Sequence, residues 1–175
     1  MELLLVRHAI AADPRPGQPD AQRSLTERGR RRMRKAVAGL AAMDLRCDRL
    51  LHSPWKRAAQ TAELLRPLVT GESHATELLA RAPSPELLAH VRGTPRGEAA
   101  ERGDRAGRAP RVALVGHQPW MGELLALLIT GSDRAGEAAL FGKGGVAWLV
   151  GECKPGGMQL RALFPPRVLR SLSRT

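Results

Sequence analysis

Arginine, histidine and serine side chains follow three apolar runs of the sequence. The run LLLV precedes Arg7 and His8, the run LL precedes His52 and Ser53 with Arg57 shortly after, and the run ALVG precedes His117. Guanidinium groups bind phosphate oxygens through paired N–H donors, and a neutral imidazole is a competent nucleophile at phosphorus. Nearby arginines also lower a histidine pKa, because they disfavour a second positive charge. We therefore predict that these residues bind and attack a phosphoryl group.

These side chains can act together only if the three apolar runs are strands of one sheet. Strands are predicted over residues 2–6, 47–53 and 111–117, and helices over residues 24–43, 54–68, 83–91 and 119–130. Strands that alternate with helices are typical of a parallel sheet, and such sheets bind ligands at the carboxyl ends of their strands. The three motifs should therefore meet at one edge of the sheet.

Local signals predict where the first two long helices begin. Ser24 and Glu27 have capping-box spacing at the start of the first helix. Gly29 weakens that helix but could allow close approach of another backbone segment. Ser53 is expected to cap the second helix, with Pro54 at its first position, where proline is favoured.

The C-terminal part of the chain predicts an antiparallel addition to the sheet. Residues 145–152 and 157–164 are two apolar runs separated by a short turn, which is typical of a β-hairpin. Residues 93–110 are rich in glycine, proline and charge, and we expect an exposed, mobile connection there. The 175 residues are expected to form one domain, an α/β fold built as a three-layer α/β/α sandwich with a mostly parallel central sheet.

Composition restricts the class of protein. Hydrophobic residues make up 43% and charged residues 26% of the chain, as in ordinary soluble globular proteins. The N-terminal apolar run is too short for a signal peptide, and no stretch approaches the roughly 20 apolar residues that span a bilayer. We therefore expect a cytoplasmic protein that does not associate with a membrane. The net charge of +11 comes from arginines spread along the chain and does not indicate a particular partner.

Together, the blocks LLLVRHA, LLHSPWKRAAQT and ALVGHQP resemble, in order and spacing, the three signature blocks of the histidine phosphatase superfamily. Ala9 stands where the first block usually has glycine, a variant common in one branch. The segment PDAQRSLTERG resembles the Asp-x-x-Arg-Pro-Leu-Thr-x-x-Gly segment of that branch, the SixA-type phosphohistidine phosphatases, with Ser24 in place of proline. The resemblance covers roughly residues 1–165 and implies a phosphoglycerate mutase-like fold.

The resemblance also implies a role for each matched residue. His8 would be the nucleophile and would form a phosphohistidine intermediate that water then hydrolyses. Arg7 and Arg57 would bind the phosphoryl oxygens, and His117 would complete the pocket and stabilise transition-state charge. Ser53 would either bind substrate through its hydroxyl or only cap its helix. The reaction would need no metal and no cofactor.

The sequence leaves the proton donor for the leaving group open. Asp20 and Glu77 are the candidates, with Asp13 as a third. Glu77 falls where the family often has Pro-Glu-Leu, although Thr76 replaces the proline. A phosphoramidate substrate would need less help, because its imidazole departs readily once it is protonated.

Several alternatives accompany this interpretation. A small phosphate ester, such as a sugar or nucleotide phosphate, is the alternative to a partner protein that carries phosphohistidine. A metal site is disfavoured because the three blocks hold no carboxylate or thiolate ligand, and Cys47 and Cys153 have no metal-binding spacing. A nucleic-acid-binding module is disfavoured by the scarcity of aromatic residues and of known binding motifs. A non-catalytic protein that only binds phosphorylated ligands is disfavoured because all the core positions are present.

One charged cluster has two interpretations. The segment RGRRRMRK is read as the solvated face of a helix, with docking of an acidic partner as the alternative. The sequence carries no signal for an oligomeric state.

Overall fold

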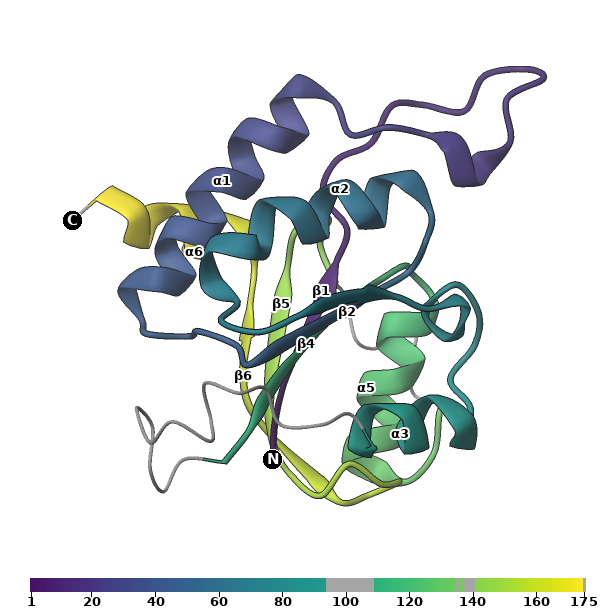
Figure 1. Cartoon of the computed structure of the whole chain (residues 1–175), viewed down its shortest axis with the longest axis vertical. Helices are drawn as coiled ribbons and strands as arrows, with labels where there is room; N and C mark the ends of the chain where they lie inside the picture. Colours follow the sequence, from purple (N-terminus) through teal and green to yellow (C-terminus); the bar gives the residue numbers. More distant parts are fainter. Residues whose placement is uncertain (94–108, 135, 137–140, 175) are drawn as a thin grey trace.

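A six-stranded sheet forms the centre of the computed structural model, which describes residues 1–93, 109–134, 136 and 141–174. The strands are β1 (Glu2–Arg7), β2 (Arg49–His52), β3 (Ser73–Ala75), β4 (Arg111–Gly116), β5 (Val146–Gly151) and β6 (Met158–Phe164). Their order across the sheet is β3-β2-β4-β1-β5-β6 (Figure 1). The first four strands in this order run parallel, and β5 is antiparallel to both of its neighbours. The predicted α/β fold with a mostly parallel sheet is confirmed.

Helices cover both faces of the sheet. On one face lie α1 (Glu27–Ala42), α2 (Lys56–Leu65) and α6 (Pro166–Ser171), and on the other lie α3 (Pro85–Arg92) and α5 (Trp120–Thr130) (Figure 1). Short 3-10 helices lie in the connections at η1 (Asp20–Gln22), η2 (Arg66–Leu68) and η3 (Glu77–Leu79), and η5 (Leu172–Arg174) follows α6. The structure therefore has the three layers that the sequence predicts.

The continuous apolar run of β1 reflects burial on both of its faces. Leu4 and Val6 pack in the core beneath α1, α2 and α6, whereas Leu3 and Leu5 pack in the core beneath α3 and α5. All four side chains are at most 2% exposed. A central strand of a parallel sheet needs apolar residues at every position, because helices cover both sides. Arg7 is the first residue of this strand beyond the apolar core.

The predicted capping box of α1 is wrong, because Thr26 caps the helix. The Thr26 hydroxyl accepts a hydrogen bond of 2.9 Å from the Gly29 N–H, and the helix begins at Glu27. Ser24 is held in extended backbone, since its carbonyl accepts from the Ala12 N–H at 2.8 Å. Pairing with the chain that leaves β1 thus prevents the helix from starting earlier.

Two glycines bring other backbone segments against α1. A Cβ atom at Gly29 would lie 2.1 Å from the carbonyl oxygen of Ile10, so the predicted close approach is confirmed. A Cβ atom at Gly39 would lie 2.0 Å from the carbonyl oxygen of Leu169. Leu169 belongs to α6, a helix that the sequence pattern did not predict in the basic C-terminal tail, and its side chain is fully buried. Contact with α1 stabilises this short helix.

The remaining predictions mostly agree with the structure. α3 begins at Pro85 behind a Ser84 cap, and the hairpin of β5 and β6 is confirmed. The short edge strand β3 was not predicted. The expectation for residues 93–110 falls largely on residues 94–108, which lie outside the described part of the chain. Within the described part, no helix has the length and apolar character needed to cross a membrane.

Candidate active site

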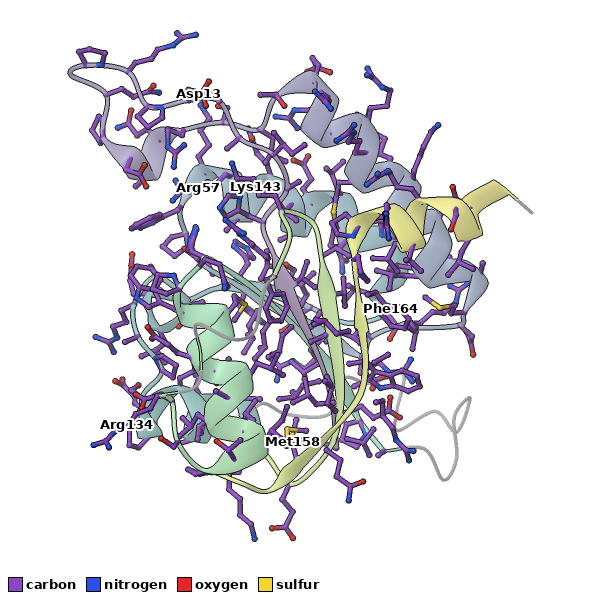
Figure 2. The ribbon with its side chains drawn as sticks, turned by 180° about the vertical axis from the view of Figure 1, so that it is seen from behind. Asp13, Arg57, Arg134, Lys143, Met158 and Phe164 are labelled. Atoms are coloured by element: carbon purple, nitrogen blue, oxygen red, sulfur yellow. The ribbon has the colours of Figure 1, made fainter. Side chains whose placement is uncertain are left out.

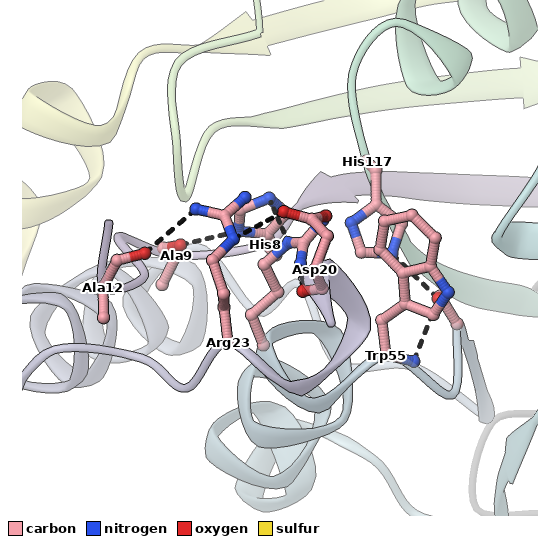
Figure 3. Close-up of polar contacts among 9 residues, drawn as sticks. His8, Ala9, Ala12, Asp20, Arg23, Trp55 and His117 are labelled. Carbon is pink, nitrogen blue, oxygen red and sulfur yellow. Dashed lines mark hydrogen bonds and ion pairs between the residues drawn. The ribbon is translucent and has the colours of Figure 1, made fainter. Parts of the chain in front are cut away.

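Strand pairing brings the three sequence motifs to one edge of the sheet. Arg7 of β1 pairs with Gly116 of β4, so His8 and His117 leave neighbouring strands at the same level. Their ring centroids are 5.2 Å apart (Figure 3). The Ser53 N–H donates to a carbonyl of β4 at 3.0 Å, which places the end of β2 beside them. The carboxyl ends of three adjacent parallel strands therefore form the site, as expected for this type of sheet.

A cavity of about 440 Å³ opens at this edge. Its lining is strongly basic and partly aromatic, and comprises Arg7, His8, Ala11, Asp20, Arg23, Trp55, Arg57, His117, Gln118, Trp120 and Lys143. The structure thus brings Arg7, His8, Arg57 and His117 into one cavity. Among the described residues, Asp20 is the only acidic residue that lines the cavity.

Hydrogen bonding selects one tautomer of His8. Its Nδ1 lies 2.7 Å from the carbonyl oxygen of Ala9, which can only accept, so Nδ1 carries the proton. Nε2 therefore keeps its lone pair, and it accepts a hydrogen bond from Arg57 Nε at 3.2 Å. Burial lowers the pKa of His8 to about 4, and the positive charges of Arg57, Arg7 and Lys143 add to the shift, against the hydrogen bond to Ala9. His8 is neutral at physiological pH, with its nucleophilic nitrogen beside a guanidinium group.

Arg57 occupies the first turn of α2 and is only 3% exposed. In addition to its contact with His8, its guanidinium donates to the Asp20 side chain at 2.7 Å and to the Asp20 carbonyl at 2.6 Å. It also lies over the Trp55 ring, 4.6 Å from the centroid. Burial lowers the pKa of Arg57 while Asp20 raises it, and the group remains a cation at neutral pH. His8, Asp20 and Trp55 thus hold the Arg57 side chain in place in the wall of the cavity.

Arg7 presents an N–H group that donates to none of the described residues. One terminal nitrogen of its guanidinium donates to the carbonyl oxygen of Phe141, which orients the group. Its Nε atom is buried and has no hydrogen-bond partner among the described residues. A buried donor without a partner costs about 1–3 kcal/mol, so such groups are uncommon unless a ligand accepts the hydrogen bond.

Ser53 orients His117 and does not cap α2. That helix begins at Lys56 without a side-chain cap, so the predicted capping role is wrong. The Ser53 hydroxyl accepts from the Trp55 N–H at 3.2 Å and lies 2.8 Å from His117 Nε2. The hydroxyl can donate its own hydrogen to Nε2, and the His117 tautomer with its proton on Nδ1 matches that direction. Ser53 is fully buried and does not line the cavity.

His117 lines the cavity, and one nitrogen of its ring bonds to none of the described residues. Its Nδ1 atom is buried and has no partner in the described part of the structure. Burial, followed by repulsion from His8 and Arg57, lowers the pKa of His117 to about 3. The ring is therefore neutral at physiological pH and can donate one hydrogen bond through Nδ1.

The three candidate proton donors lie in different surroundings. Asp20 is in the cavity and forms ion pairs of 2.7 Å with both Arg57 and Arg23. Slight burial would raise the pKa of its carboxyl, but the hydrogen bonds from the two arginines outweigh that effect and lower the pKa. Glu77 is exposed on η3, and Asp13 is exposed on the loop before η1 (Figure 2); neither lines the cavity.

Six residues that line the cavity were not identified from the sequence, and four of them carry charged or aromatic side chains. Trp55 and Trp120 follow the second and third motifs closely, and each lies within 5.9 Å of the His117 ring by centroid distance. Arg23 belongs to the Asp-x-x-Arg segment, whose spacing was a usable signal. Lys143 comes from a glycine-rich loop that packs against the end of β1. The N–H of the next residue, Gly144 (φ +81°), donates to the carbonyl oxygens of Arg7 and His8, each at 3.1 Å. No sequence pattern predicted that last contact.

The donor set does not resemble a metal site. Among the described residues, no group of three or more histidine, cysteine, aspartate or glutamate side chains is arranged to hold a metal ion. The basic lining of the cavity instead suits a multiply charged anion, since guanidinium groups repel cations and bind oxyanions through paired N–H donors.

Comparisons with known proteins agree with this geometry. Residues 3–80 match the family model of the histidine phosphatase superfamily (branch 1). An uncharacterized protein of Picosynechococcus sp. is 37% identical over 123 residues, which cover 70% of each chain.

Solved structures with the same fold include several phosphatases. The protein histidine phosphatase SixA complexed with tungstate has a TM-score of 0.74 at 22% identity and covers 97% of this chain and 99% of its own. A protein of Agrobacterium tumefaciens assigned as the phosphohistidine phosphatase SixA has a TM-score of 0.69 at 27% identity, with 94% and 97% covered. The alpha-ribazole phosphatase of Shigella flexneri has a TM-score of 0.65 at 20% identity, with 95% and 97% covered.

Proposed function

The chain belongs to the histidine phosphatase superfamily, and we propose that it removes the phosphoryl group from phosphohistidine through a covalent intermediate on His8. One observation carries the proposal. The unprotonated Nε2 of a neutral, buried His8 lies 3.2 Å from Arg57 Nε in a cavity lined by cations. This arrangement combines an uncharged nucleophile with binding groups for a doubly charged phosphoryl group, which a structural histidine would not need.

In the first step, Nε2 of His8 gives up its hydrogen bond from Arg57 Nε, and the lone pair that is released attacks phosphorus. The bond from phosphorus to the substrate nitrogen breaks, and its electron pair stays on the leaving imidazole, which departs as a neutral ring when its other nitrogen is protonated. Arg57 and the unused Nε–H of Arg7 bind the phosphoryl oxygens, and the Nδ1–H of His117 donates to a third. These donors are held in place before the reaction, so little reorganisation is needed as negative charge moves onto oxygen.

In the second step, water attacks phosphorus of the phosphorylated His8. The electrons of the P–N bond return to Nε2, and both hydrogens of the water molecule remain with the released phosphate. The proton on Nδ1 stays in its hydrogen bond to the Ala9 carbonyl throughout. That bond keeps the ring in the tautomer that can begin another cycle.

The surroundings of Asp20 favour a phosphoramidate over an ester. Its ion pairs with Arg57 and Arg23 lower the pKa of a carboxyl that is ionised at neutral pH in any case, so it is a poor proton donor to an alkoxide leaving group. A protonated imidazole leaves without such a donor. The indole rings of Trp55 and Trp120 line the same cavity and offer apolar faces against which an imidazole ring can pack.

A small phosphate ester is the second candidate substrate. The observation that favours it is the similarity of this fold to a phosphatase of alpha-ribazole phosphate esters and to a phosphoserine phosphatase of Entamoeba histolytica, which has a TM-score of 0.63 at 18% identity. The phosphoryl-binding groups would act identically on either substrate. The two candidates differ only in the leaving group, which the cavity walls must accommodate.

A substrate panel in the presence of EDTA tests the proposal. Free phosphohistidine and a phosphohistidine peptide should be hydrolysed faster than phosphoserine, a sugar phosphate or a nucleotide, and chelation should leave the rate unchanged. A higher rate with the esters would favour the second candidate. Dependence on added metal would contradict the mechanism.

Variants test the assigned roles separately. His8→Ala should abolish turnover, and the trapped phosphoenzyme of the unmodified protein should be labile in acid and stable in base. Arg57→Ala should lower kcat/KM at least about 100-fold, equivalent to about 3 kcal/mol of transition-state stabilisation. Arg81→Ala, which removes an exposed arginine outside the cavity, serves as the control and should have no effect. Turnover that survives His8→Ala would assign the nucleophile elsewhere.

A further inference from the structure

A second cavity adjoins the active site on the side of α1 and α6. It measures about 420 Å³ and lies between these two helices and the loop that carries Lys143. Its rim holds four cations, Arg32, Lys143, Arg167 and Arg170, around an apolar floor that includes Met33. We call this cavity the α1–α6 pocket.

In the part of the chain that the structure describes, the cations of the α1–α6 pocket have no counter-ions. No acidic residue lines the pocket, and none of the four side chains forms an ion pair with another residue in the described part of the chain. Several exposed cations elsewhere are paired, for example Arg81 with Glu86 at 2.8 Å. The positive charge of Arg28, partial burial, and then the charges of Arg170 and Arg31 lower the pKa of Arg32. This local repulsion disfavours the folded state and would be relieved by a negatively charged ligand.

The α1–α6 pocket shares a wall with the active-site cavity. Lys143 lines both cavities, and the residues that follow β1 divide between them, with His8 in one and Ala9 in the other. Figure 2 shows Lys143 beside Arg57 at the end of the molecule where α1 begins. A protein whose phosphohistidine reaches His8 therefore brings the neighbouring part of its surface close to this shared wall.

From this juxtaposition we propose that the α1–α6 pocket binds an acidic segment of the phosphohistidine-bearing protein, next to its phosphorylated histidine. The inference rests on the proposed function, because it names a feature of that substrate. Carboxylates of the segment would pair with the arginines on the rim, and its apolar side chains would cover the floor. The pocket has no aromatic side chain on which a nucleic-acid base could stack, so a protein segment fits it better.

The expected energy comes from several weak pairs acting together. An exposed ion pair contributes at most about 1 kcal/mol. Two or three such pairs should therefore lower KM, or raise the association rate constant, roughly tenfold at low salt. The gain should decrease as salt rises, because exposed charges are screened within about 10 Å at 0.1 M ionic strength. Loss of Arg32 and Arg167 should leave the chemistry at His8 unaffected, because neither residue lines the active-site cavity.

Two phosphohistidine peptides that differ only in charge test the proposal. One carries four glutamates beside the phosphohistidine, and the other carries four glutamines. The protein should hydrolyse the glutamate peptide with about tenfold higher kcat/KM, and Arg32→Gln combined with Arg167→Gln should remove this preference. Free phosphohistidine should be hydrolysed equally by both proteins. Equal rates for the two peptides with the unmodified protein would overturn the proposal.

A matched control separates the pocket from the overall charge. Arg34→Gln combined with Lys35→Gln removes the same charge from exposed positions of α1 outside the pocket, and it should keep the preference for glutamate. If this control loses the preference as completely, net charge and not the pocket is responsible, and the proposal is wrong.

A binding measurement keeps the inference distinct from the proposed function. Fluorescence anisotropy with labelled, unphosphorylated versions of both peptides measures the pocket without turnover. Failure to hydrolyse phosphohistidine would refute the proposed function, whereas tighter binding of the glutamate peptide that is lost in Arg32→Gln/Arg167→Gln would still support an acidic ligand. Binding of a single-stranded oligonucleotide that exceeds that of the glutamate peptide and depends on the same two arginines would overturn the assignment to a protein segment.

Discussion

The pH dependence of folding tests the protonation state of His8 without a substrate. Burial lowers the pKa of this imidazole to about 4 in the folded protein, whereas the unfolded chain has the ordinary value of 6.5. Between these values the unfolded state binds more protons, so the free energy of unfolding decreases as the pH falls. The stabilising contribution is fully present above about pH 6.5 and is lost progressively toward about pH 4.

The size of the effect follows from the two pKa values. At about pH 5, His8 is almost fully protonated in the unfolded chain and about nine-tenths neutral in the folded protein. The free energy of unfolding is therefore about 2 kcal/mol lower at this pH than at about pH 7.5. Lowering the pKa of His117 to about 3 adds a similar loss of about 2 kcal/mol. A combined loss of about 4 kcal/mol is a large part of the stability of an ordinary domain.

Urea unfolding of three proteins at about pH 7.5 and about pH 5 measures this contribution. His8→Gln should lose about 2 kcal/mol less than the unmodified protein between the two pH values. Thr61→Val is the control, because Thr61 accepts a hydrogen bond from the Ala9 N–H but does not titrate. This variant should be less stable at both pH values, with an unchanged difference between them. If His8→Gln and the unmodified protein lose the same free energy within about 0.5 kcal/mol, His8 titrates normally and the reasoning is refuted.

Two further substitutions test the packing and the hydrogen bonds around the site. Gly29→Ala gains about 1 kcal/mol of helix propensity, but its Cβ atom would lie 2.1 Å from the Ile10 carbonyl oxygen. We therefore expect the free energy of unfolding, measured by heat or urea, to fall by about 1–2 kcal/mol. A stabilised variant would contradict the observed approach. Ser53→Ala removes the hydroxyl that hydrogen-bonds with His117 Nε2 and should lower kcat about tenfold with little change in KM. Nitrogen NMR of the imidazole should then show a mixture of tautomers, and an unchanged spectrum would argue against this role of Ser53.

The sequence was sufficient to indicate the core of the site, because strand ends and catalytic motifs coincide. A run of four apolar residues before Arg7 requires a strand that is buried on both faces, and such a strand lies inside a parallel sheet. The same argument applies before Ser53 and His117, so the motifs had to converge at the carboxyl edge once the strands were parallel. These local patterns are properties of short segments, and they do not depend on the path of the rest of the chain.

Other features could be decided only by tertiary contacts. The Lys143 loop packs against the end of β1 through backbone hydrogen bonds, which any sequence can form. The pKa of Asp20 is lowered because its loop folds back onto Arg57, and no spacing rule links those two residues. Likewise, α6 forms because Gly39 admits the Leu169 backbone against α1. Periodicity and motif spacing determine which elements form and what their ends carry, whereas the pairing of distant segments sets the charge, the tautomers and the walls of the cavity.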